Sequence, residues 1–308
     1  MSDKKQFDIA VIGGGPAGYT AAVYAGRAGY TCVVFEKASP GGQMGITSSI
    51  ENYPGFMSVD GFDLAAKMLE QAMNFGAECV YEEVTGVELA GKEKTVRTAS
   101  GAYACRAVII ASGAKPRLIG VPGEAEYTGR GVSYCATCDG MFFRGKTVIV
   151  NGGGDTAFED ALYLSNVCEK VYLVHRRDAF RAAASMVRKA EAKENIEFVK
   201  SAVIEEILGD GKAVAGAKLR NTVTGEESVL EAAGIFAAIG RVPDTALVKD
   251  LLKLDDHGYI IADETTRTSV DGVYAAGDVR TKALRQIVTA CADGANAVHY
   301  AEEWLSEE

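Results

Sequence analysis

A glycine-rich turn occurs twice in this chain, each time between an apolar run and a helical pattern. The sequence GGGPAG stands at 13–18, and GGGDTA stands at 152–157. A second apolar run ends at the same distance after each turn, at Glu36 and at His175. A strand, a glycine-rich turn, a helix and a second parallel strand form the βαβ unit that binds dinucleotides. The repeat therefore predicts an α/β fold with two Rossmann-like nucleotide-binding domains.

The positions of the glycines are those that a phosphate-binding turn requires. Gly13 permits a tight bend after the strand, Gly15 lets backbone amides approach a pyrophosphate, and Gly18 lets the helix pack closely on the strand. The second turn has the same arrangement at Gly152, Gly154 and Ala157. Both turns are therefore predicted to hold nucleotide phosphates.

The two units differ where their second strands end. Glu36 can accept hydrogen bonds from a ribose hydroxyl and would repel a 2′-phosphate. The second unit ends its strand in His175-Arg176-Arg177, with Arg181 following. Because planar guanidinium groups bind phosphate oxygens well, the second unit is predicted to take NADPH. The first is predicted to take a dinucleotide whose ribose is unphosphorylated.

Cys135 and Cys138 lie between the two turns, with Asp139 directly after them. Two thiols at this spacing can form a redox-active disulfide, and one of them commonly has a lowered pKa. Zinc sites use the same spacing but need further ligands. The other cysteines form no second pair, and they are Cys32, Cys79, Cys105, Cys168 and Cys291. The nucleotide units on either side favour redox chemistry, so we predict no metal site.

The order of the apolar runs predicts how the two units are connected. The tail of the chain returns with a strand that ends at Gly277-Asp278, which suits the sheet of the first unit. We therefore predict that the second unit is inserted into the first. Residues 1–117 and 246–308 would form one domain and residues 118–245 the other, with the two connections as a double hinge.

Composition narrows the class of partner. The formal net charge of −10 argues against binding to nucleic acid or to an anionic membrane surface. No stretch approaches the roughly 20 apolar residues of a membrane span, and the first residues lack the pattern of a signal peptide. The odd number of cysteines does not suggest a secreted disulfide framework. We predict a cytoplasmic protein.

Short motifs run through the whole chain in order. They are GGGPAG at 13–18, GGQ at 41–43, IENYPG at 50–55, CATCDG at 135–140, GGGDTA at 152–157, HRRDAFRA at 175–182 and AAGDV at 275–279, followed by Arg285-Gln286. By these motifs the chain resembles the low-molecular-weight, bacterial-type NADPH-dependent thioredoxin reductases. CATCDG together with HRRDAFRA is highly specific for that family.

The resemblance implies that the first unit binds FAD and the second NADPH. It places Asp278 on the ribityl chain or phosphate of FAD, and Arg285 and Gln286 beside the isoalloxazine. The residues implied in cofactor binding are Gly13, Gly15, Pro16, Ala17, Gly18, Glu36, Lys37, Gly41, Gly42, Gln43, Asn52, Ala111, Gly113, Gly277, Asp278, Arg285, Gln286, Gly152, Gly154, Asp155, Thr156, Ala157, His175, Arg176, Arg177, Arg181, Ile239, Gly240 and Arg241.

The resemblance also implies a mechanism and partners. Cys138 would face the flavin, Cys135 would attack the disulfide of thioredoxin or a thioredoxin-like CxxC protein, and Asp139 would act as the acid/base. The family is usually a homodimer, and its members rotate their domains between half-reactions. A non-enzymatic alternative is a flavin-holding redox sensor, but such a protein would not need both nucleotide sites and a dithiol.

Overall fold

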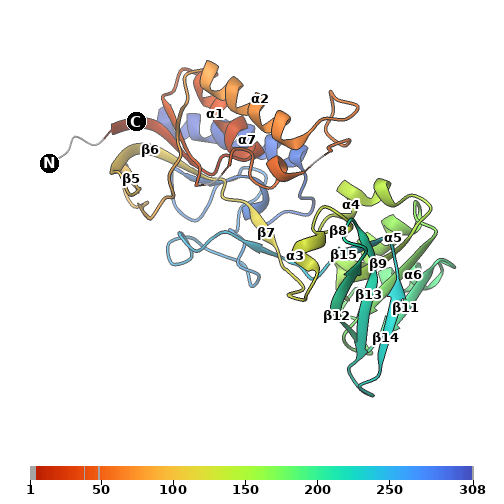
Figure 1. Cartoon of the computed structure of the whole chain (residues 1–308). Helices are drawn as coiled ribbons and strands as arrows, with labels where there is room; N and C mark the ends of the chain where they lie inside the picture. Colours follow the sequence, from red (N-terminus) through yellow and green to blue (C-terminus); the bar gives the residue numbers. More distant parts are fainter. Residues whose placement is uncertain (1–4, 38, 48, 307–308) are drawn as a thin grey trace. The chain divides into compact units, whose positions relative to one another are not determined.

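The computed structural model describes residues 5–37, 39–47 and 49–306, and the chain forms two compact units (Figure 1). Unit 1 consists of Met1–Lys115 and Val242–Glu308, and unit 2 consists of Pro116–Arg241. Unit 2 is thus inserted into the sequence of unit 1. Each unit contains a mostly parallel sheet with helices packed on it, which confirms the predicted α/β fold class.

Seven strands within the described residues form the sheet of unit 1, in the order β3-β2-β1-β6-β5-β4, with β17 paired to β6. Their bounds are β1 (Lys5–Ile12), β2 (Cys32–Phe35), β3 (Glu78–Val80), β4 (Gly86–Glu88), β5 (Lys94–Arg97), β6 (Ala102–Ile110) and β17 (Val273–Ala275). β4 and β5 are antiparallel to their neighbours, and the remaining pairs are parallel. The C-terminal half of β1 and all of β2 are buried, as expected for parallel strands covered on both faces.

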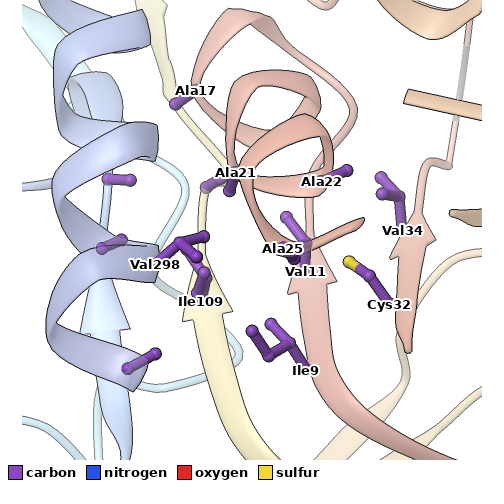
Figure 2. Packing of buried hydrophobic residues seen from close by; sticks show 14 of the residues in the cluster. Ile9, Val11, Ala17, Ala21, Ala22, Ala25, Cys32, Val34, Ile109 and Val298 are labelled. Carbon is purple, nitrogen blue, oxygen red and sulfur yellow. The ribbon is translucent and has the colours of Figure 1, made fainter. Parts of the chain in front are cut away.

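Helices α1 (Pro16–Arg27) and α7 (Ile287–Ser306) of unit 1 contribute side chains to the same core as its sheet. The helices and 3₁₀ turns of this unit are α1 (Pro16–Arg27), η1 (Met44–Ile46), α2 (Gly61–Asn74), η3 (Gly277–Val279) and α7 (Ile287–Ser306). Figure 2 shows Ala21 and Ala25 of α1 and Val298 of α7 gathered around Ile109 of β6. A methyl group at Gly294 of α7 would lie 2.2 Å from the carbonyl oxygen of Ala17, so glycine permits the close approach of α7 to α1.

Unit 2, all of whose residues are described, contains a five-stranded parallel sheet in the order β11-β10-β9-β15-β8 and a three-stranded antiparallel sheet, β12-β13-β14. The strands are β8 (Val132–Ser133), β9 (Thr147–Asn151), β10 (Lys170–His175), β11 (Ile196–Lys200), β12 (Ala202–Gly209), β13 (Val214–Asn221), β14 (Glu227–Glu231) and β15 (Gly234–Ala237). The helices are α3 (Glu124–Tyr127), α4 (Ala136–Asp139), η2 (Gly140–Phe143), α5 (Asp155–Ser165) and α6 (Ala184–Glu191). The order β9-α5-β10-β11 repeats β1-α1-β2-β3 of unit 1.

The two connections between the units pair with each other. β7 (Ala114–Pro116) and β16 (Arg241–Pro243) form a two-stranded sheet, and the amide of Arg117 donates to the carbonyl of Gly240 at 3.0 Å. Each of these strands crosses a boundary between the units. Unit 2 begins at Pro116 and ends at Arg241, so both boundaries fall a few residues before those predicted from the sequence, 118 and 245.

No helix of the described ranges is both long and apolar enough to cross a membrane, including α7 with its 20 residues.

Candidate nucleotide and disulfide sites

At two positions of the turn between β1 and α1, Gly13 and Gly18, no side chain larger than that of glycine fits. Gly13 has a φ of +116°, and a methyl group there would lie 2.3 Å from the carbonyl oxygen of Ala111. A methyl group at Gly18 would lie 1.9 Å from the carbonyl oxygen of Gly13. These contacts fix the path of the turn and bring the end of β6 against it, as the roles predicted for these glycines require.

The opposite side of this turn is open. A methyl group at Gly15 would find its nearest described neighbour, the carbonyl oxygen of Gly41, at 3.9 Å. Gly15 caps α1, and among the described residues no side chain accepts from the first amides of that helix. The amide of Gly14 donates to Oε2 of Glu36 at 2.9 Å, which holds this carboxylate beside the turn. A helix start with free amides next to an acid fits a dinucleotide with a free ribose hydroxyl.

Several predicted residues from distant parts of unit 1 meet in space. Nδ2 of Asn52 donates to Oε1 of Gln286 at 3.0 Å, across more than two hundred residues of sequence. The guanidinium of Arg285 lies 4.1 Å from the ring centre of Tyr259. Its Nε is buried and has no hydrogen-bond partner within the described residues, so a donor is left over for a bound group.

Asp293 of α7 is a residue that the sequence motifs did not indicate. Its carboxylate is buried and accepts from the amide of Gly277 at 2.8 Å, from Nη2 of Arg280 at 2.7 Å and from Nζ of Lys282 at 2.8 Å. Burial would raise the pKa of Asp293, but the hydrogen bonds from Arg280 and Lys282 outweigh it and lower the pKa. This network holds Gly277 and thereby the adjacent Asp278.

We expect Asp293→Asn to lower the free energy of unfolding by about 3–5 kcal/mol at pH 7, because it leaves two buried cations uncompensated. Since the folded state lowers the pKa of Asp293, its carboxylate stabilises the fold at neutral pH. That contribution is lost as the pH falls through the folded-state pKa, below 3.8. Urea unfolding at several pH values measures both effects.

The matched control is Glu78→Gln, since Glu78 pairs with Lys5 in the open at 3.3 Å. Exposed pairs contribute less than about 1 kcal/mol. Equal losses in the two variants, or a loss in Asp293→Asn that does not shrink as the pH is lowered below 3.8, would contradict this role of Asp293.

Lys37 forms an ion pair with Asp244. Its Nζ lies 2.9 Å from Oδ2 of Asp244, and the amide of Asp244 donates to the carbonyl of Gly113 at 2.9 Å. Oγ of Ser112 donates to the carbonyl of Asp244 at 2.7 Å. Lys37 and Gly113, both predicted to bind a cofactor, therefore meet at Asp244, which no motif indicated.

The second turn repeats the first. A methyl group at Gly152 would lie 2.4 Å from the carbonyl oxygen of Ala238. At Gly154 it would find nothing within 4 Å in the described part of the chain, and α5 begins there without a side-chain cap. Oδ1 of Asp155 accepts from the amide of Ala183 at 2.8 Å, which ties the turn to the start of α6. The open helix start again fits an anion.

His175 and the arginines after it have different surroundings. A methyl group at Gly153 would lie 2.2 Å from Nδ1 of His175, and the ring is buried against Phe180. Burial first, and then the neighbouring arginines, lower the pKa of His175, so the ring is neutral at pH 7. The arginines are exposed, and they are Arg176, Arg177 and Arg181. The strand end thus presents three exposed cations close in sequence to a neutral histidine.

Asp160 of α5 lies near Arg241 and was also not indicated by any motif. Burial is the main cause that raises its pKa to about 7; Glu159 adds to the rise, and Arg241 opposes it. Nε of Arg241 is buried and has no partner among the described residues. An acid with a raised pKa and a buried donor without a partner in the described part of the chain therefore lie near each other in unit 2.

Cys135 and Cys138 form a disulfide at the start of α4. The carbonyl of Cys135 accepts from the amides of Cys138 at 3.2 Å and Asp139 at 3.1 Å, which closes the turn around the sulfurs. Burial raises the pKa of Asp139, while a hydrogen bond from Ser133 opposes the rise. A disulfide next to an acid with a raised pKa can accept two electrons and a proton.

The remaining predicted positions lie on the elements that form the turns. Gln43 and Gly42 are exposed beside the buried Gly41, directly before η1. Gly240, with a φ of +102°, follows the half-buried Ile239 after β15. Pro16, Ala17, Thr156 and Ala157 stand in the first turns of α1 and α5.

Comparison with known proteins gives one family. Residues 7–294 match the family described as pyridine nucleotide-disulphide oxidoreductase. The chain is similar to a thioredoxin reductase of Listeria monocytogenes, with 49% identity over 99% of this chain and 96% of the relative. A thioredoxin reductase of Bacillus subtilis is 47% identical, over 98% and 97%. The crystal structure of thioredoxin reductase from Streptococcus pyogenes matches with a TM-score of 0.93 and 44% identity, covering 99% of this chain and 100% of that one.

Proposed function

The chain belongs to the pyridine nucleotide-disulphide oxidoreductase family and, within it, to the thioredoxin reductases, and from this premise we propose its substrates and cofactors. It is a disulfide oxidoreductase. We propose that it moves electrons from NADPH, through FAD and the Cys135–Cys138 pair, to the disulfide of thioredoxin or a thioredoxin-like CxxC protein. The observation that carries the proposal is the Cys135–Cys138 disulfide beside Asp139, in the same unit as the arginine-flanked turn.

Unit 1 would hold FAD. The open side of Gly15 and the free amides of α1 suit its pyrophosphate, and Glu36 suits the adenosine ribose. Asn52, Gln286 and the leftover Nε of Arg285 offer polar groups for the flavin end. When bound, FAD supplies the two-electron chemistry that side chains cannot perform.

Unit 2 would hold NADPH. The free start of α5 at Gly154 suits the pyrophosphate. The exposed guanidinium groups of Arg176, Arg177 and Arg181 suit the 2′-phosphate. Because the NADPH turn and the disulfide share unit 2 while the FAD turn belongs to unit 1, we also propose that the units rotate about β7 and β16 between half-reactions.

Exchange with the partner would follow the chemistry of the dithiol. The Cys135 thiolate attacks one sulfur of the partner disulfide, and the sulfur that leaves takes a proton from Asp139. Cys138 then gives its proton to Asp139 and attacks Sγ of Cys135. This closes the enzyme disulfide and frees the second partner sulfur, which takes a proton from solvent. The partner gains two electrons and two protons, and the enzyme pair loses two electrons.

The test is to follow the flavin colour of the purified holoenzyme under anaerobic conditions. We expect NADPH to bleach it, NADH at the same concentration not to bleach it, and oxidised thioredoxin to restore it. Continuous assay against a panel of the host's small CxxC proteins would then identify the partner. Failure of NADPH to bleach the flavin would rule the reductase out and leave a flavin-holding sensor.

We further propose that the protein is a cytoplasmic homodimer. Its five other cysteines, all within the described residues, are free thiols, which are rare in oxidising compartments. On unit 1 an apolar groove of about 560 Å³ between α2 and α7 includes Tyr24, Phe56 and Val288, all of them exposed. A second copy covering this groove would explain these exposed side chains. Analytical ultracentrifugation that finds only monomer would refute the dimer.

A further inference from the structure

Ser133 lies two residues before Cys135, and no motif indicated it. We propose that Ser133 is a positioning residue that holds Asp139 beside the Cys135–Cys138 pair and allows Asp139 to gain and lose its proton without moving. The proposal rests on the function proposed above for this pair and names a further residue on which it depends.

Ser133 is buried and paired into the parallel sheet of unit 2. It belongs to β8, the edge strand of the parallel sheet, where it pairs with Phe236 of β15, and the residue is only 4% exposed. Asp139 stands at the end of the four-residue helix α4. A helix this short has little stability of its own. The position of Asp139 therefore depends on contacts that α4 makes with better-anchored residues such as Ser133.

The Ser133 hydroxyl makes three contacts that enclose the turn of the disulfide. Its Oγ lies 2.6 Å from Oδ2 of Asp139, to which it donates. It lies 3.1 Å from the amide nitrogen of Cys135, from which it accepts. The carbonyl oxygen of Cys135 is 3.4 Å away. One hydroxyl thus connects the acid to both backbone groups of Cys135.

These contacts serve both charge states of Asp139. A hydroxyl has one donor and two acceptor positions. When Asp139 is ionised, Ser133 donates to it, as the 2.6 Å distance indicates. When Asp139 is protonated, its O–H can donate to Oγ of Ser133, and the hydroxyl proton can turn to the carbonyl of Cys135. Neither state leaves a polar group of the cluster without a partner, so the carboxyl need not move during the proton transfer.

The hydrogen bond also opposes the effect of burial on Asp139. Burial raises the pKa of Asp139, and the Ser133 hydroxyl lowers it again by stabilising the carboxylate. Without the hydroxyl, Asp139 would hold its proton to higher pH and return it to the partner sulfur less readily. A hydrogen bond to a charged group corresponds to a shift of about one to two pH units.

The experiment compares Ser133→Ala with wild type in two readouts. The first is the pH dependence of iodoacetamide alkylation of Cys135 and Cys138 in protein reduced with dithiothreitol, without any nucleotide. The second is the pH dependence of kcat/KM for thioredoxin in the NADPH assay. In wild type, the inflection due to Asp139 is the one that Asp139→Asn abolishes. We expect Ser133→Ala to move that inflection upward by about one to two pH units, and to slow thioredoxin reduction about tenfold at pH 7.

Two controls separate positioning from a general loss of structure. Ser165→Ala removes another buried hydroxyl of unit 2, one that donates only to the carbonyl of Leu162 in its own helix, and should leave both profiles unchanged. Ser133→Thr keeps the hydroxyl and should restore the wild-type inflection. If Ser133→Ala does not fold, Ser133→Thr and Ser133→Val become the decisive pair, because they have the same shape and differ only in the hydroxyl.

The proposal would be overturned if the Asp139 inflection fell at the same pH in wild type and in Ser133→Ala. It would equally be overturned if that inflection fell at the same pH in Ser133→Thr and in Ser133→Val. Because alkylation needs neither NADPH nor thioredoxin, it gives this answer even if the proposed reductase function fails. Failure of that function would instead appear as wild-type protein that does not reduce thioredoxin.

Discussion

We expect Cys138→Ser to lower kcat/KM for thioredoxin by about three orders of magnitude or more. Residues that act together in one reaction each cost most of the activity when they are removed singly, and the two sulfurs form such a pair. Cys135 can still attack a partner disulfide, but no second sulfur remains to close the enzyme disulfide and release the partner. The mixed disulfide should therefore accumulate. Non-reducing electrophoresis and mass spectrometry would detect a covalent complex between the enzyme and thioredoxin through Cys135.

The companion variants make this prediction specific. Cys135→Ser should lose the same activity and form no such complex, because the attacking sulfur is gone. Cys168→Ala is the matched control: Cys168 is a buried free thiol of the same unit, and burial raises its pKa to about 11. It should keep full activity. Accumulation of the complex with Cys135→Ser, and not with Cys138→Ser, would reverse the roles assigned to the two sulfurs.

The double variant Arg176→Ala/Arg177→Ala should lower kcat/KM for NADPH by about 100-fold or more and leave kcat/KM for NADH nearly unchanged. Both guanidinium groups are exposed just after β10, where they could donate to a 2′-phosphate. Each such charge-assisted contact is worth about 1.5–3 kcal/mol. Initial rates of flavin reduction at several concentrations of each nucleotide measure the ratio.

Arg188→Ala provides the control for general charge. Arg188 is an exposed arginine on α6 of the same unit, well after the end of β10 in the sequence. Its replacement also removes a positive charge from unit 2 but leaves Arg176 and Arg177 in place. It should affect NADPH only slightly, and high salt should not abolish the difference between the variants. Equal losses for NADPH and NADH in the double variant would show that the arginines do not read the 2′-phosphate.

Local sequence was enough to predict the parts of the site that depend on backbone shape. The two turns after β1 and β9 could be predicted because only glycine fits where a methyl group would meet the carbonyl of Gly13 or Ala238. The disulfide depends on two cysteines three positions apart, a spacing that is visible in the chain itself. Buried strands such as β2 appear as continuous apolar runs.

Contacts between distant residues could not be predicted in this way. The pairing of Asn52 with Gln286, of Lys37 with Asp244 and of Asp293 with Arg280 joins side chains from separate elements of unit 1. Ser133 could have been suspected from its closeness to Cys135. However, its hydrogen bond to Asp139 depends on how α4 turns back toward β8. The pairing of the two connections, β7 with β16, likewise has no signal in either segment.

The division follows from the range of the forces involved. Glycine turns, apolar strands and the CxxC spacing are decided by steric contacts and burial within a few residues, so the amino-acid sequence alone determined the two nucleotide units, the fold class and the redox pair. The protonation of Asp139, the ion pair of Lys37 with Asp244 and the buried charges around Asp293 are decided by hydrogen bonds and charges that meet only after the chain has folded. Only the tertiary structure could decide these.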